Sequence, residues 1–119
     1  TGTGNGTENI NLTMTTGITL GNNNSIGVYA KNINSSVTGD MYVGTNTSIG
    51  IVSEGNGNVT YSGDLTIEDK GTGVNDTGSV GIYKLDGTGT VNVLAGSWNV
   101  GNNGIWNFLE TGSRTISNN

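Results

Sequence analysis

The stretch Ser25-Ile26-Gly27-Val28-Tyr29 decides the fold, because its pattern returns three more times along the chain. The later copies are Ser48-Ile49-Gly50-Ile51-Val52, Ser79-Val80-Gly81-Ile82-Tyr83 and Asn103-Gly104-Ile105-Trp106. Their central glycines stand at 27, 50, 81 and 104, so successive copies are 23, 31 and 23 residues apart. A period in the twenties made of short β-branched runs is typical of a solenoid, in which each repeat forms one coil.

A second set of glycines repeats with nearly the same period. Its members are Gly17, Gly39, Gly63 and Gly96, at spacings of 22, 24 and 33 residues. The longest interval of both sets includes the segment 68–78, whose residues are mostly glycine, polar or charged. We interpret this segment as a corner with about eight extra residues, which a solenoid tolerates because the entropic cost of loop closure grows slowly with length.

Between the glycines, apolar and polar residues alternate, as at Ile10, Leu12 and Met14, and this period of two indicates strands with one buried face. We therefore predict an all-β fold without helix: a parallel β-helix, or β-solenoid, with about 22–24 residues per coil, three short strands per coil and about 4–5 coils. Residues 1–9 have no apolar side chain and are predicted to be a flexible lead-in. Residues 10–119 are predicted to be a single solenoid segment, with an inserted corner loop at about 68–78.

Strands of successive coils then pair in parallel about 4.8 Å apart, so that equivalent residues stack into rows. The rows predicted to face inward are Ile26/Ile49/Val80, Val28/Ile51/Ile82 and Ile18/Met41/Leu65/Trp98. We expect this stacking to be the main source of stability, because one coil cannot bury its own apolar face.

An outward row contains the candidate ligand-binding residues. Two residues after each anchor glycine stand Tyr29, Val52, Tyr83 and Trp106. Exposed aromatic side chains mark recognition surfaces, so Tyr29, Tyr83 and Trp106 form a candidate strip for sugar rings or a protein partner. The same rings can instead serve the fold alone, by stacking across neighbouring strands.

The composition supplies little for other chemistry. The net charge is -5 and the four basic residues are scattered, which argues against a nucleic-acid partner. The chain has no His and no Cys, so the common nucleophile–base pairs cannot form. Asp40 and Asp64 occupy matching positions and could share Ca²⁺ or act as an acid–base pair, but two solvated side chains are the favoured interpretation. We predict no enzyme, no catalytic residue, no metal site and no cofactor.

The repeats resemble those of a known family. Stretches such as Asn24-Ser25-Ile26-Gly27-Val28-Tyr29-Ala30-Lys31-Asn32, alternating with Thr38-Gly39-Asp40-Met41-Tyr42-Val43-Gly44, are similar to the passenger regions of large type V autotransporter adhesins, notably the long fusobacterial type. The similarity covers roughly residues 10–116 and rests on the style of the repeat. The resemblance implies a right-handed parallel β-helix on the bacterial cell surface that mediates attachment to host cells or to other bacteria. Without a signal peptide or translocator barrel, the chain is expected to be a fragment of such a protein, or a subunit of a stacked fibre.

The expected function is thus a non-enzymatic, extracellular adhesin segment: a rigid stalk with a recognition face for a protein or glycan surface ligand. No apolar run approaches the roughly 20 residues that span a bilayer, so this segment is not expected to insert into membranes. Three alternatives stay open. The chain could be a filament subunit whose copies stack end to end, an ice-binding solenoid that uses its Thr-x-Thr triplets, or a carbohydrate-active enzyme with clustered acids.

Overall fold

The computed structural model describes residues 1–5, 7–94, 96–109 and 113–116. These residues form strands joined by corners, and none of them lies in a helix. The strands are β1 (Gly2–Thr3), β2 (Asn9–Thr13), β3 (Ile18–Thr19), β4 (Ile26–Lys31), β5 (Asn34–Thr38), β6 (Met41–Val43), β7 (Ile49–Glu54), β8 (Val59–Ser62), β9 (Leu65–Ile67), β10 (Val80–Leu85), β11 (Thr90–Val93), β12 (Trp98–Val100), β13 (Ile105–Leu109) and β14 (Ser113–Ile116).

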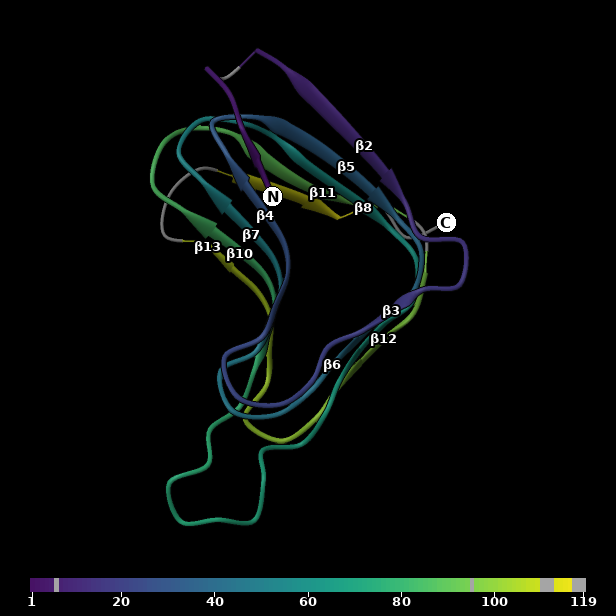
Figure 1. Ribbon diagram of the computed structural model, residues 1–119, viewed down its shortest axis with the longest axis vertical. Coiled ribbons are helices and arrows are strands. Elements are labelled where there is room, and N and C mark those ends of the chain that lie inside the picture. The colour runs from purple at the N-terminus through teal and green to yellow at the C-terminus, as the bar shows by residue number, and fades with distance from the viewer. Residues whose placement is uncertain (6, 95, 110–112, 117–119) are drawn as a thin grey trace.

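Every third strand along the chain pairs in parallel, which confirms the predicted parallel β-helix. Sheet A has the order β1-β4-β7-β10-β13, sheet B the order β2-β5-β8-β11-β14 and sheet C the order β3-β6-β9-β12. Figure 1 looks along the stacked coils, and the three sheets form the three sides of the coil. Between β2 and β14, paired residues are 23 to 25 positions apart outside the insertion, as in Ile26 with Ile49 and Ile10 with Ser35, and β1 pairs with β4 at 28 positions.

Part of the segment 1–9, which the sequence predicts to be a flexible lead-in, pairs with the solenoid. Gly2 and Thr3 pair with Ala30 and Lys31 in sheet A. The N–H of Gly4 then donates to the carbonyl of Lys31 at 2.9 Å. Backbone pairing needs no apolar side chain, and for this reason the polar sequence of this segment did not reveal a strand.

The core is a column of stacked side chains enclosed by the three sheets. The predicted row of Val28, Ile51 and Ile82 is buried. The row of Met41 and Leu65 is also buried, with Ile18 and Trp98 partly buried at its two ends. Sheet B contributes a third set of buried side chains, which includes Val37, Tyr61 and Val93.

One predicted inward row faces outward instead. Ile26 is 51% exposed, and its row partners Ile49 and Val80 are only partly buried. The cause lies at the next residue, because a Cβ on Gly27 would stand 3.1 Å from both Leu20 Cδ1 and Met41 Cε in the core. Gly27 and Val28 therefore both turn inward, and the strict alternation of the strand is interrupted between them. The strands of sheet A bend toward the core, as Figure 1 shows.

The anchor glycines stack at 27, 50 and 81, but Gly104 lies outside this column. Ile105 pairs with Val80 and Asn107 with Ile82, so the backbone of Trp106 lies level with Gly81. Gly104 sits in the preceding corner, where its N–H donates to the carbonyl of Gly101 at 3.0 Å. Gly104 is thus two residues out of register, and Gly17 is out of register by one: it lies level with Asp40 instead of Gly39, since Ile18 pairs with Met41.

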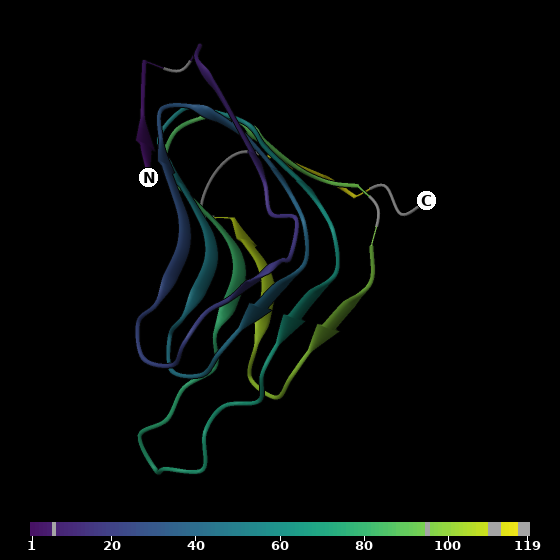
Figure 2. The ribbon, with the colours of Figure 1, turned by 45° about the vertical axis from the view of Figure 1, so that its right-hand side comes forward.

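The insertion connects β9 to β10 and extends away from the coils, as both ribbon views show (Figures 1 and 2). Val74 lies in it with 98% of its surface exposed. The carboxylate of Asp76 accepts the N–H of Gly73 at 2.8 Å, and the Asp76 N–H donates to the Gly73 carbonyl at 3.1 Å. The pairing of Ile49 with Val80 shows that the coil resumes its register directly after the insertion.

Side-chain oxygens at the corners tie each coil to the next. In each case an Asn or Asp carbonyl or carboxylate oxygen accepts the backbone N–H of the equivalent residue one coil later. These pairs are Asn22 with Thr45, Asn32 with Asn56, Asn34 with Asn58, Asp40 with Asp64, Asn46 with Thr77, Asn56 with Thr88, Asn58 with Thr90, Asp64 with Ser97 and Asp69 with Asn102. The abundance of Asn in this chain thus has a structural role, since these bonds satisfy corner N–H groups that no strand pairs.

Lys84 is enclosed completely within the core beneath sheet A. Its ammonium donates to the carbonyl of Gly55 and, at 3.3 Å, to the carbonyl of Asp86. Burial lowers the pKa of this amine, and the nearby charge of Asp86 acts in the opposite direction. From within the core, the Lys84 side chain therefore connects two successive corners between sheets A and B.

Candidate functional site

The outer faces of the three sheets differ in chemistry. On sheet B, the outward side chains of the paired strands are Asn, Ser or Thr, as in Asn11, Ser36 and Thr60. On sheet C the outward row consists of Thr19, Tyr42, Thr66 and Asn99. Among the side chains that the structure describes, sheet A alone presents two rows that are mostly apolar, and this face is the candidate recognition site.

The first of these rows lies at the start of the strands and is aliphatic throughout. Ile26, Ile49, Val80 and Ile105 are paired in register across β4, β7, β10 and β13. The two outer members, Ile26 and Ile105, are 51% and 43% exposed. The bend at the anchor glycines creates this row, because it turns outward side chains that strict alternation would bury.

The second row lies three residues further along each strand and contains the aromatic rings. Its members are Tyr29, Val52, Tyr83 and Phe108. The rings of Tyr83 and Phe108 are stacked, with centroids 5.0 Å apart and an interplanar angle of 24°. Val52 stands between Tyr29 and Tyr83 and is buried although it points outward.

The register corrects one candidate residue of this row. Tyr29 and Tyr83 stand where the sequence placed them, but the position beside Tyr83 belongs to Phe108 instead of Trp106. The Trp106 side chain lies outside the described part of the structure. Alignment of Ile105 with Val80, in place of Gly104 with Gly81, would have found Phe108, because it matches Phe108 to Tyr83. A ligand-binding role for these rings stays a prediction.

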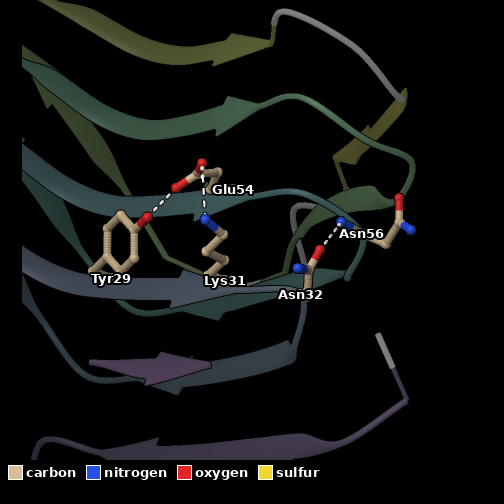
Figure 3. A network of polar contacts seen from close by, with 5 residues as sticks. All are labelled: Tyr29, Lys31, Asn32, Glu54 and Asn56. Carbon is tan, nitrogen blue, oxygen red and sulfur yellow. Dashed lines mark hydrogen bonds and ion pairs between the residues drawn. The ribbon is translucent and has the colours of Figure 1, made fainter. Parts of the chain in front are cut away.

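A polar cluster of Tyr29, Lys31 and Glu54 lies at the end of the aromatic row that is nearest to the N-terminus of the chain (Figure 3). The hydroxyl of Tyr29 donates to the carboxylate of Glu54 one coil later. Lys31 Nζ lies 3.5 Å from the same carboxylate, at Oε1. The hydrogen bond from Tyr29 lowers the pKa of Glu54, and the same bond raises the pKa of Tyr29. Glu54 is therefore ionised at neutral pH and fixes the direction of the Tyr29 ring.

A hydrogen bond between successive coils also holds the corner next to this cluster. The N–H of Asn56 donates to the amide oxygen of Asn32 at 2.9 Å, as the close-up shows (Figure 3). Asn32 has a φ of 54°, a left-handed conformation that Asn tolerates better than most residues. The end of sheet A that holds Tyr29, Lys31 and Glu54 thus rests on a hydrogen-bonded corner.

The carboxylates of the paired acids, Asp40 and Asp64, accept hydrogen bonds from backbone N–H groups. Asp40 Oδ1 accepts the N–H of Asp64 at 2.9 Å, and Asp64 Oδ1 accepts the N–H of Ser97 at 2.9 Å. Across the described ranges, no three His, Cys, Asp or Glu side chains gather into a group that could hold a metal ion. The same residues include no helix long and apolar enough to cross a membrane.

Comparison with known proteins gives no relative. No family model, no curated protein and no solved structure matches the chain.

Proposed function

We propose that this chain is a non-enzymatic segment of a bacterial surface adhesin, a rigid β-helical stalk that binds a protein partner through the outer face of sheet A. The observation that carries the proposal is the difference between the faces: sheet A displays two long apolar rows, whereas sheets B and C display mostly polar side chains. Exposed apolar side chains that lie together and are bordered by polar groups are typical of protein-interaction surfaces. The extracellular setting and the bacterial cell surface are part of the proposal, and their support is the resemblance of the repeats to autotransporter passenger regions.

A protein partner suits the chemistry of this face. Aromatic residues are enriched at the centres of protein interfaces, and charged residues tend to lie at their rims. Tyr83 and Phe108 supply stacked rings, the aliphatic row lies beside them, and Lys31 and Glu54 stand at the edge. The rings are held by neighbouring coils, so little side-chain entropy is lost when a partner binds.

The proposal is tested by adhesion of beads that carry the chain. Beads coated with the native chain are expected to bind epithelial monolayers or bacterial lawns better than beads coated with albumin. Double substitution Ile26→Lys/Phe108→Lys should reduce adhesion about tenfold or more, because it places one charge in each of the two apolar rows. Leu94→Lys is the matched control, since Leu94 is apolar and 40% exposed but lies after β11, away from sheet A.

Three outcomes would contradict the proposal. Native beads could adhere no better than albumin beads, or the double variant could adhere as well as Leu94→Lys. Adhesion that survives protease treatment of the target cells but not periodate oxidation of their glycans would exclude a protein partner. Beads that aggregate with one another instead of binding cells would indicate self-assembly, and sedimentation of the free chain would measure it.

A further inference from the structure

The outer face of sheet B carries a regular array of uncharged polar groups. Its side chains form three rows across the coils: Asn9/Asn34/Asn58/Thr90, Asn11/Ser36/Thr60/Asn92 and Thr13/Thr38/Ser62, the last of which continues to the exposed Leu94. Every other member is Asn, Ser or Thr, so these rows offer many hydrogen-bond donors and acceptors and no charge. Successive members of a row are one strand spacing apart, about 4.8 Å.

The first row has a fixed orientation. Asn34 Oδ1 accepts the N–H of Asn58 at 2.8 Å, and Asn58 Oδ1 accepts the N–H of Thr90 at 2.8 Å. Because the oxygen of each amide is engaged by the next coil, the NH₂ group of the same amide is directed away from that bond. Two NH₂ donors are thus held at equivalent positions in neighbouring coils, without any cost of ordering when a ligand binds.

The second row is available for hydrogen bonds. In the part of the chain that the structure describes, the side chains of Asn11, Ser36, Thr60 and Asn92 make no hydrogen bond to another residue. These side chains line a shallow groove of about 380 Å³ that crosses the coils, together with Asn9, Asn34 and Asn58 of the first row and with Ile10 and Ser35. The groove contains no charged and no aromatic side chain among its lining residues.

We propose that this groove is a second binding site, distinct from the face of sheet A, and that it takes a neutral, hydroxyl-rich glycan chain. Sugar hydroxyls both donate and accept hydrogen bonds, which matches amide and hydroxyl side chains. A nucleic acid or an acidic polysaccharide would need clustered Lys and Arg, and the rows supply none. A polymer suits an array that repeats in every coil, since several weak contacts along one chain add up to useful affinity.

The test measures retardation of the native chain in gels that contain hydroxyethylcellulose, dextran or yeast mannan. At least one of these neutral polysaccharides is expected to slow the native chain. Asn58→Asp keeps the oxygen that accepts the Thr90 N–H but removes the outward NH₂ donors, and should weaken the apparent affinity roughly fivefold. Asn22→Asp is the matched control, because Asn22 accepts the Thr45 N–H at 2.8 Å in another corner and the charge change is identical.

Equal melting temperatures of the two variants would show that both stay folded. The proposal is overturned if none of the three polysaccharides slows the native chain, or if both variants bind equally well. Thermal hysteresis of the native chain without any retardation would assign the same face to ice and would also overturn it. The substitution pair Ile26→Lys/Phe108→Lys should leave retardation unchanged, so failure here and failure of the adhesion proposal are distinguishable.

Discussion

Replacement of Tyr61 by alanine is expected to lower the free energy of unfolding by about 4 kcal/mol. Of the side chains that the structure describes, Tyr61 is the largest that the core encloses fully, with 0% of its surface exposed. It stacks on Val37 and Val93 of the neighbouring coils, and removal of its ring would leave a cavity that two coils share. Such a cavity cannot collapse easily, because the parallel pairing on both sides fixes the distance between coils.

The Tyr61 hydroxyl adds a separate contribution. It lies 2.8 Å from the carbonyl oxygen of Gly39 and 3.0 Å from that of Asp64, to which it donates. Tyr61→Phe keeps the ring and removes the donor, and should cost about 1–2 kcal/mol. Chemical denaturation measured by circular dichroism gives both values. Tyr42→Ala is the control, because Tyr42 is 39% exposed on sheet C and should cost about 1 kcal/mol or less.

The same hydroxyl makes the stability of the folded chain depend on pH. Burial, and then the charges of Asp40 and Asp64, raise the pKa of Tyr61 above its ordinary value of 10.0. The unfolded chain therefore ionises first, so the stabilisation is complete below pH 10 and is lost as the pH rises above that value. The native chain should lose stability above pH 10 more steeply than Tyr61→Phe. Parallel pH curves for the two proteins, or a small loss in Tyr61→Ala, would contradict this description of the core.

Substitution Gly50→Val is expected to cost more than about 3 kcal/mol and to leave little folded protein. A Cβ on Gly50 would stand 2.6 Å from the carbonyl oxygen of Gly81, an atom of the backbone that cannot move without breaking the pairing of coils. The added methyl groups would also meet Met41 and Val43 in the core. Thermal melts of the purified variant measure the effect.

Ile49→Val provides the control for Gly50. Ile49 precedes the glycine in the same strand, points outward and is only partly buried, so the loss should be about 1 kcal/mol or less. A Gly50→Val protein as stable as Ile49→Val would mean that the anchor glycines do not approach the next coil closely.

Much of the fold followed from the sequence, because each coil of a solenoid repeats the same pattern of glycines and apolar residues. The period, the parallel pairing and the buried row of Val28, Ile51 and Ile82 could be read from spacing and alternation alone. Ile26 was misplaced because alternation assumes a straight strand, and the bend at Gly27 is visible only as a contact with Leu20 and Met41. The fourth repeat was misaligned by two residues because a glycine in a turn and a glycine in a strand look alike in sequence.

Other features of the candidate sites depended on three-dimensional contacts. Lys84 follows Tyr83 in an apparently ordinary polar position, and only the fold shows that it points inward to the carbonyls of Gly55 and Asp86. The abundance of Asn suggested turns, but the direction of each amide is set by which N–H its oxygen accepts one coil later, as for Asn58 and Thr90. The spacing of residues in the sequence predicts the row in which a residue stands. It does not predict the direction in which the polar atoms of the side chain point.

Both proposed faces rest on the register between coils, and a disulfide test in the last coil measures that register most directly. The chain has no cysteine, so an engineered pair reports only on itself. Tyr83 and Phe108 are Cα partners in adjacent parallel strands, at a separation that a disulfide can bridge. The double substitution Tyr83→Cys/Phe108→Cys should therefore oxidise to an intramolecular disulfide, and Tyr83→Cys/Trp106→Cys should stay reduced. Oxidation of the second pair but not the first would contradict the register, and with it the aromatic row on sheet A.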